Sequence, residues 1–425
     1  MKKELNLKND ISRREFVSKL AYTTFGVSLL ETPSFAADTN FGRAKHVIYI
    51  YCNGGLSHLD SFDPKTKVPS CKSIKTNADF EISEYFPELS RHGDKFSVIR
   101  NMTSKSGAHA QAEYAMRTSY SKNSLIVHPT VGAISYNLLG KQHSSIPDNI
   151  LINGSADHPK AGYFPKRFSP LPIVNPNEGL RFSRSSIENA QFNNRLELLR
   201  GIDENFRKIY QTEETKSYSE LYDETLKLLK SKDLELFDLN KEDAATRDKY
   251  GRGNFGQGLL LARRLIASGV RFVEVGSSQS FDFHNDIVDS MNRTKDTFDK
   301  GLAALFEDLT KTGLIKDTII VIATEFGRTP FYKEDGKFLP YSKNGGRDHA
   351  PGAFSCVVGG MNLGGKVIGQ TSELGDKVEG EAYTVGSLNS TIGHLLGIKH
   401  DQIWFSPQNR PFKIGNSAEP IKELI

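Results

Sequence analysis

Short apolar runs, rich in β-branched residues, alternate with helix-favouring segments through most of the chain. The run Thr318–Ala323 is apolar throughout, which is typical of a strand with both faces buried in a parallel sheet. Further runs of this kind occupy residues 46–51, 96–99, 270–275 and 354–358. Between them lie segments with helical character: residues 110–116, 259–266, 302–309 and 384–396.

This alternation of buried strands and helices predicts a three-layer α/β sandwich around a mostly parallel central sheet. One part of the chain departs from the pattern. Residues 145–185 hold prolines and glycines among apolar residues, and residues 186–250 are charged and helix-favouring. We therefore expect a single α/β domain over residues 38–425, with a loop-rich and helical insertion at about residues 145–250.

The first 37 residues have the parts of an export signal in the expected order. The segment Ser12–Val17 (Ser-Arg-Arg-Glu-Phe-Val) resembles the twin-arginine signal, a weakly apolar stretch runs from Leu20 to Leu30, and Ser34–Ala36 offers a cleavage site. These features predict export by the twin-arginine machinery to the periplasm or the outside of the cell. An ordinary amphipathic helix is the alternative, and it does not explain why the three features occur in this order.

Composition excludes several other classes of protein. The chain has 425 residues, 25% of them charged, and its formal net charge is only +4. Without a polybasic block, nothing indicates nucleic acid as a partner, and no internal apolar stretch is long enough for a transmembrane segment. The three cysteines form no Cys-x-x-Cys pair, and their odd number indicates no disulfide framework.

Residues that can bind metals or act in catalysis follow several of the predicted strands. Because parallel sheets bind ligands beyond the carboxyl ends of their strands, we expect these residues to meet at one edge. They form four clusters: Asn53 with Asp60 and Asp63; Ser104, Ser106 and His109; Asp282 with His284; and Glu325, Arg328, Asp348 and His349.

Oxygen and imidazole ligands without thiolates suit a divalent metal, with zinc as the first expectation and manganese, calcium or magnesium as alternatives. Such a metal could activate water or a hydroxyl group and polarise a phosphoryl or sulfuryl oxygen. Arg328 and Arg347 could add bidentate contacts to a tetrahedral anion.

Each residue also has a simpler interpretation. Glu325 could cap a loop or pair with Arg328, and His109 could be a loop histidine bonded to the backbone. Ser104 and Ser106 lie in a small polar loop, where serine is common. A shared site is favoured because several strands deliver such residues to the same edge.

Five segments together give the chain a resemblance to a known family: Asn53–Lys65, Leu260–Ile266, Asp282–His284, Glu325–Pro330 and Gly346–His349. The chain resembles the family called domain of unknown function 1501, a branch of the alkaline phosphatase–sulfatase superfamily, over roughly residues 45–412. The resemblance implies an alkaline-phosphatase-like parallel sheet flanked by helices, with one or two metals at its carboxyl edge.

The resemblance also implies roles for individual residues. It places Ser106 or Ser104 in the nucleophile region, and with Arg328 and His109 from the clusters above these are the candidate catalytic residues. It places Asn53, Asp282, His284, Glu325 and His349 at metal positions, and Asp348 and Asp60 from the clusters complete the candidate ligands.

The chain departs from the superfamily pattern at defined positions. Asn53, a neutral ligand, replaces the usual aspartate after the first strand, and Asp60 could substitute for it. Phe326 stands where the superfamily places a ligating histidine. No Cys-x-Pro-x-Arg motif lies near Ser106, which disfavours a sulfatase of the formylglycine type.

Two hypotheses about function follow. In the first, the chain is an exported metal-dependent hydrolase of phosphate or sulfate esters of a small molecule or carbohydrate, with either serine or metal-bound water as the attacking group. In the second, it is a catalytically degenerate periplasmic binding or scaffold protein that keeps the fold. Phe326 and Asn53 motivate the second hypothesis.

Overall fold

The protein was analysed as a computed structural model that describes residues 40–425, apart from residues 69–70, 182–188 and 211. The segment expected to be a twin-arginine signal, residues 1–37, lies outside the described residues. In the part of the chain that the structure describes, no helix is both long and apolar enough to cross a membrane.

A nine-stranded sheet forms the middle layer, in the order β14-β4-β13-β8-β1-β7-β5-β6, with β17 paired to β4. Within this described sheet, only β13 runs antiparallel to its neighbours. The sheet is therefore mostly parallel, as the sequence predicts. Its strands are β1 (His46–Tyr51), β4 (Phe96–Thr103), β5 (Asn149–Ile152), β6 (Leu171–Ile173), β7 (Phe272–Gly276), β8 (Thr318–Ala323), β13 (Phe354–Gly359), β14 (Val367–Ile368) and β17 (Tyr383–Thr384).

Strands β1 and β8 form the centre of the sheet. They pair in parallel from His46 opposite Thr318 to Tyr51 opposite Ala323, and every residue of both strands is buried. Because the two strands end at the same level, the segments that follow them leave the sheet at one edge. The neighbouring strand β7 adds its own following loop to this edge through its parallel pairing with β1.

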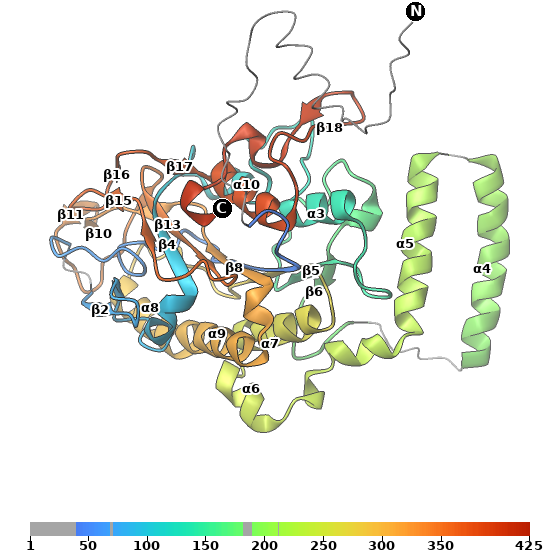
Figure 1. Cartoon of the computed structure of the whole chain (residues 1–425), viewed down its shortest axis with the longest axis horizontal. Helices are drawn as coiled ribbons and strands as arrows, with labels where there is room; N and C mark the ends of the chain where they lie inside the picture. The colour runs from blue at the N-terminus through green and yellow to red at the C-terminus, as the bar shows by residue number, and fades with distance from the viewer. Residues whose placement is uncertain (1–39, 69–70, 182–188, 211) are drawn as a thin grey trace, which may run out of the picture. The chain divides into compact units, whose positions relative to one another are not determined.

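Helices cover both faces of the sheet, which completes the predicted three-layer architecture (Figure 1). Helices α7 (Asn254–Ala267) and α9 (Lys300–Thr312) contribute to one hydrophobic core, while α3 (Val131–Leu139) and α10 (Val385–Leu396) contribute to the other. The remaining described helices are α2 (His109–Thr118), α4 (Asn189–Ile209), α5 (Glu213–Leu229), α6 (Ala244–Tyr250) and α8 (Ile287–Thr294).

The expected insertion begins later in the chain than the sequence pattern indicates. Strands β5 and β6 both fall within residues 145–250, yet they join the central sheet beside β7. The helices α4 and α5 follow them. Short two-stranded sheets lie outside the central sheet: β2 (Ser73–Lys75) with β3 (Glu81–Ser83), β9 (Gly327–Arg328) with β12 (His349–Ala350), β10 (Tyr332–Glu334) with β11 (Lys337–Leu339), β15 (Gln370–Thr371) with β16 (Val378–Glu379), and β18 (Trp404–Phe405) with β19 (Pro411–Phe412).

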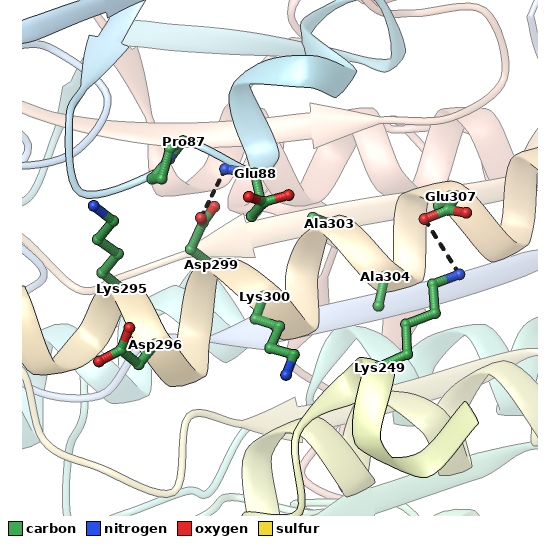
Figure 2. A pocket seen from close by; sticks show the side chains of 10 residues that line it. All are labelled: Pro87, Glu88, Lys249, Lys295, Asp296, Asp299, Lys300, Ala303, Ala304 and Glu307. Atoms are coloured by element: carbon green, nitrogen blue, oxygen red, sulfur yellow. Dashed lines mark hydrogen bonds and ion pairs between the residues drawn. The ribbon is translucent and has the colours of Figure 1, made fainter. Parts of the chain in front are cut away.

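A buried aspartate joins α9 to the loop before β4. Asp299 ends a π-helical turn, Lys295–Asp299, and its two oxygens accept the backbone N–H groups of Glu88 and Leu89, each at 2.8 Å. Figure 2 shows the contact with Glu88. Burial raises the pKa of Asp299 to about 6. The carboxyl group therefore caps the 3₁₀ helix that starts at Leu89 and fixes it against α9.

A buried ion-pair network links α2 to the sheet near its carboxyl edge. Arg117 Nε donates to Glu274 Oε1 at 2.7 Å, and His158 Nε2 lies 3.0 Å from Glu274 Oε2. Burial acts to raise the pKa of Glu274, but Arg117 and His158 outweigh it and lower the pKa to about 2. The Arg117 guanidinium also lies 3.8 Å from the centre of the Tyr51 ring.

The substitution Glu274→Gln tests this network. It keeps the shape of the side chain but removes the charge that faces Arg117. We expect the free energy of unfolding to fall by about 3 kcal/mol, as when one partner of a buried ion pair is removed. Urea unfolding followed by circular dichroism measures the change.

The matched control is Glu381→Ala, which removes an exposed carboxylate 4.0 Å from Lys422. Exposed pairs contribute little, so this variant should unfold at the same urea concentration as the wild type. If Glu274→Gln also leaves the midpoint unchanged, the buried network does not stabilise the fold.

Candidate metal centre

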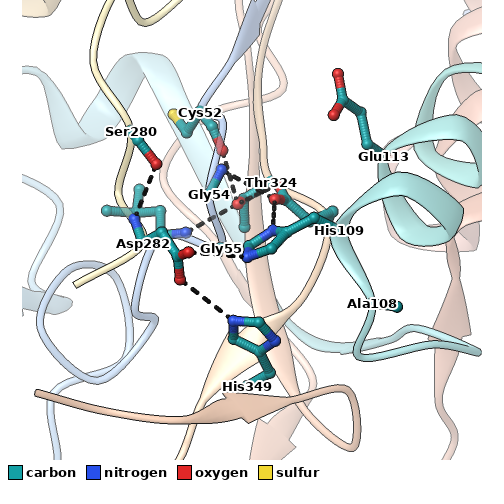
Figure 3. Close-up of polar contacts among 12 residues, drawn as sticks. Cys52, Gly54, Gly55, Ala108, His109, Glu113, Ser280, Asp282, Thr324 and His349 are labelled. Atoms are coloured by element: carbon teal, nitrogen blue, oxygen red, sulfur yellow. Dashed lines mark hydrogen bonds and ion pairs between the residues drawn. The ribbon is translucent and has the colours of Figure 1, made fainter. Parts of the chain in front are cut away.

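Three histidines and one aspartate converge at the carboxyl edge of the sheet; Figure 3 shows His109, His349 and Asp282 among them. His109 is the first residue of α2, Asp282 and His284 lie in the loop after β7, and His349 lies in β12. Asp282 Oδ1 is 3.0 Å from His284 Nε2 and 3.2 Å from His349 Nε2. Asp282 Oδ2 is 3.3 Å from His109 Nε2. All four were expected at this edge, and the structure brings them together.

Each of the three imidazole rings has a hydrogen-bond acceptor behind it, at Nδ1. The acceptors and distances are Glu325 Oε1 for His109 at 2.7 Å, the Gly107 carbonyl for His349 at 2.7 Å, and Asp348 Oδ1 for His284 at 3.2 Å. An acceptor at Nδ1 holds the ring proton there, so the lone pair of Nε2 faces inward. This is how proteins orient histidines that bind metals.

The inward-facing atoms fit a divalent cation. His284 Nε2 and His349 Nε2 are 3.1 Å apart, a contact that a proton on one nitrogen or a cation between two lone pairs satisfies. His109 Nε2 is buried and, among the residues that the structure describes, makes no hydrogen bond, although Asp282 Oδ2 lies 3.3 Å away. Among the described residues, the ligand atoms of His109, Asp282 and His349 all lie within 4.8 Å of one another. Imidazole nitrogens with one carboxylate suit zinc better than calcium or magnesium.

Glu325, expected as a metal ligand, lies behind His109. Its side chain is 0% exposed. Oε1 accepts the Gly54 N–H at 2.9 Å as well as the His109 N–H, and Oε2 accepts the Tyr51 hydroxyl at 2.9 Å. The Thr324 hydroxyl lies 3.2 Å from Oε2 but donates its proton to the Cys52 carbonyl at 2.8 Å, so three donors satisfy the carboxylate.

The same contacts shift the pKa values of Glu325 and His109 in opposite directions. The hydrogen bond to Glu325 is the main reason that the pKa of His109 is raised. Burial acts to raise the pKa of Glu325, but hydrogen bonds from His109, the backbone and Tyr51 outweigh it and lower the pKa. Glu325 is therefore a buried anion that orients His109.

Arg328 holds Asp282 in place and does not face the solvent. It is 1% exposed, and its guanidinium donates to the Gly55, Arg347 and Gly54 carbonyls at 2.9, 2.8 and 2.6 Å and to Asp282 Oδ1 at 2.5 Å. Burial acts to raise the pKa of Asp282, and Arg328 and His349 bring it well below its usual range. The expected contact with a substrate anion is not available to this buried, fully engaged side chain.

Two further expected ligands are held by cations elsewhere. Asp60 is buried, its Oδ2 lies 2.8 Å from Arg347 Nε, and it accepts a hydrogen bond from Ser57. Asp60 and Arg347, both expected at the site, therefore pair with each other. Asp348 accepts from Lys333 Nζ at 2.8 Å besides contacting His284. Asp60 therefore lies outside the cluster, and Asp348 supports it from behind.

Asn53 lies in the glycine turn after β1 with an exposed side chain. Its carbonyl oxygen accepts the Phe281 N–H at 2.7 Å, and no contact joins its side chain to the described cluster. The turn itself matters more. Gly55 has φ +66°, and a Cβ atom there would lie 2.6 Å from the Phe326 ring. Only glycine lets the turn approach Phe326 and present the Gly54 N–H to Glu325.

The two serines expected as nucleophiles lie in the loop that leads into α2. Ser106 Oγ accepts the Ala108 N–H at 3.1 Å, and Ser104 Oγ donates to the Ser106 carbonyl at 3.2 Å. Within the described part of the chain, both hydroxyl groups hydrogen-bond to the backbone and not to the histidines. Sequence reasoning missed Tyr51 and Gly107, whose roles depend on which side chains meet in three dimensions.

Phe326 forms the apolar floor of the cluster. It is 0% exposed, and its ring centre lies 4.9 Å from that of His109 and 4.6 Å from that of His349. Phe326 thus packs against two of the inward-facing rings. Among the described residues, one group of potential metal ligands, which includes His109, Asp282 and His349, lies beside this floor.

The substitution Glu325→Gln tests the orientation of His109. Losing the carboxylate removes the interaction that favours the imidazolium form, so we expect the pKa of His109 to fall. An NMR titration of the His109 ring in metal-free protein measures this. The control Glu113→Gln changes a carboxylate on the same helix that pairs with Arg117 instead. An unchanged His109 pKa in Glu325→Gln would contradict the assignment.

Comparison with known proteins gives one family and several solved structures. The family model "Protein of unknown function (DUF1501)" matches residues 44–425. No curated protein matches the chain. The solved structures include the lipoteichoic acid synthase LtaP from Listeria monocytogenes, with 11% identity and a TM-score of 0.39 over 91% of this chain and 79% of that one.

Two other similar structures are those of a sulfatase and an alkaline phosphatase. The PsFucS1 sulfatase from Pseudoalteromonas sp. has 12% identity and a TM-score of 0.40 over 85% of this chain and 69% of that one. The alkaline phosphatase from the Antarctic bacterium TAB5 has 10% identity and a TM-score of 0.33 over 76% of this chain and 94% of that one. The match of the family model to most of the chain shows that this protein belongs to the DUF1501 family.

Proposed function

We propose that this protein is a metal-dependent hydrolase of phosphate or sulfate esters. The inner ligands would be Asp282, His109, His284 and His349, and zinc is the metal that suits them best. The observation that carries the proposal is the convergence of His284 Nε2 and His349 Nε2, 3.1 Å apart, on one oxygen of Asp282. A cation bound between the two nitrogens and the carboxylate oxygen would satisfy all three atoms at once.

The residues around the cluster have consistent roles in this proposal. A bound divalent ion would polarise an ester oxygen and make water a better nucleophile. Arg328 keeps Asp282 ionised, and Glu325 keeps the proton of His109 on Nδ1, so that both inner atoms can donate electron pairs. The N-terminus of α2 begins at His109 without a side-chain cap, which favours an anionic group nearby.

Ser106 is the preferred nucleophile in this proposal, with Ser104 and water as alternatives. Ser106 Oγ accepts a backbone N–H from Ala108, a contact that also stabilises negative charge on that oxygen. Its hydroxyl proton is left free for transfer. Ser104 uses its proton in the bond to the Ser106 carbonyl and therefore supports the loop.

The scaffold hypothesis rests on Phe326, which forms an apolar floor, and on Asn53, whose exposed side chain lies outside the cluster. A separation of Asp282 and His349 too large for them to share an ion would also support it. Their 3.2 Å separation is short enough for both to bind one cation, which favours the hydrolase. We also propose export by the twin-arginine route, supported by residues 12–17 and the cleavage site before Ala37.

Metal content and turnover test the proposal directly. Protein purified without a histidine tag should contain one zinc per chain and hydrolyse p-nitrophenyl phosphate or sulfate. His284→Ala and His349→Ala each remove an inner ligand, and we expect each to lower turnover at least about 100-fold and to lower bound metal. Plasma mass spectrometry and initial rates measure these effects.

His400→Ala is the matched control, because His400 pairs with Glu419 and contacts no residue of the cluster. It should keep both metal and turnover. If no divalent metal co-purifies and none restores hydrolysis, the hydrolase proposal fails and the scaffold hypothesis is favoured.

Ser106→Ala separates serine attack from water attack. If Ser106 is the nucleophile, the variant should keep its bound metal while turnover falls about 100-fold or more, since the covalent step is lost. Ser104→Ala should lower turnover much less. A Ser106→Ala enzyme as active as the wild type would assign the attack to water.

A further inference from the structure

A cavity of about 420 Å³ adjoins the loop that leads into the candidate metal centre. Its walls come from residues 103–106, from α2 and residues 119–122, and from residues 384–386 and 415–418. This volume falls in the range of about 300–1,000 Å³ that is usual for small-molecule sites.

The lining of this cavity is positively charged. Lys105 and Lys122 line it, and no aspartate or glutamate does. Neither lysine forms an ion pair with the residues that the structure describes. Helix α10, which is 12 residues long, begins in the cavity wall, so the positive end of its dipole adds to the charge of the lysines.

A second cavity shows that lysines alone do not make a positive pocket. It has a volume of about 520 Å³ and lies beside α9 (Figure 2). Its three lysines are accompanied by four carboxylates: Lys249, Lys295 and Lys300 with Glu88, Asp296, Asp299 and Glu307. Lys249 Nζ lies 3.3 Å from Glu307 and 2.6 Å from Asp308, so its charge is already neutralised.

The acid-free cavity is close to the metal centre along the chain. Ser106 lines the cavity, and His109 follows it by three residues, which limits the distance between their Cα atoms to about 11 Å. Gly107, between them, carries the carbonyl that orients His349. A molecule bound in the cavity would therefore lie beside the segment that carries His109.

We propose that this cavity binds the organic part of the substrate, an acidic sugar or polyol that carries a sulfate, phosphate or carboxylate group besides the ester. Lys105 and Lys122 would pair with that second anionic group. Hydroxyl side chains in the wall, including Ser121 and Ser417, suit the hydroxyl groups of a sugar. This proposal rests on the proposed function, because a sugar bound here is a substrate only if the protein is a hydrolase. Binding to the cavity can be tested separately.

The first test measures binding to metal-free protein by calorimetry. Glucose 6-sulfate and glucuronate should bind, and glucose should bind at least about tenfold more weakly, because it lacks the charge that the lysines recognise. The double variant Lys105→Ala, Lys122→Ala should lose at least about tenfold in affinity for both acidic sugars. The control Lys399→Ala removes an exposed lysine outside the cavity and should bind as the wild type does.

The second test uses the zinc-loaded protein. The double variant should lose at least tenfold in its preference for glucose 1,6-bisphosphate over p-nitrophenyl phosphate, expressed as a ratio of kcat/KM. Equal binding of glucose and glucose 6-sulfate by the wild type, or full affinity in the double variant, overturns the inference even if the enzyme is active. Loss of binding in a double variant with a wild-type urea midpoint supports the cavity even if no ester is hydrolysed, and then only the proposed function fails.

Discussion

The buried carboxylate of Glu325 is the interaction on which the edge of the sheet depends. A charge without solvent costs several kcal/mol unless its lone pairs are satisfied, and here the partners are Tyr51, Gly54 and His109. They belong to β1, to the turn after it and to α2, while Glu325 follows β8. One side chain thus ties two central strands to a helix, and the same bonds point His109 Nε2 toward Asp282. The buried charge of Glu325 requires hydrogen-bond donors, and this one requirement both holds the edge together and orients His109.

The buried charges near Glu325 are paired with opposite charges. Arg117 lies over the Tyr51 ring and neutralises Glu274 within the sheet, and Arg328 spans the glycine turn and Asp282 at its edge. Each buried charge is therefore compensated by an opposite charge or by oriented N–H and O–H groups. Because removing one partner leaves another uncompensated, such a network has few intermediate arrangements. This rigidity is what a metal site needs from the residues behind its ligands.

The sequence allows the fold class and the location of the site to be predicted, since both follow from patterns along the chain. Asp282, His284 and His349 come after buried strands, and a parallel sheet delivers them to one edge. Roles within the site could not be predicted in this way. Whether His109 or Glu325 faces inward depends on side-chain directions, and the pairing of Asp60 with Arg347 joins residues far apart in sequence. The short strands β5 and β6 were missed because four and three residues carry too little pattern to separate strand from loop.

The contacts of Phe326 suggest a different role from the one that its place in the sequence indicates. From the sequence it is a lost ligand, which indicates degeneration of the site. In the structure its ring packs against His109 and His349, and its neighbour Gly55 is a glycine because no Cβ atom fits there. A degenerate position would not constrain its surroundings in this way. An apolar floor also lowers the local dielectric and so strengthens the interaction of Asp282 and the histidines with a cation. Phe326 is therefore a packed part of the ligand cluster, a role that its position in the sequence alone does not reveal.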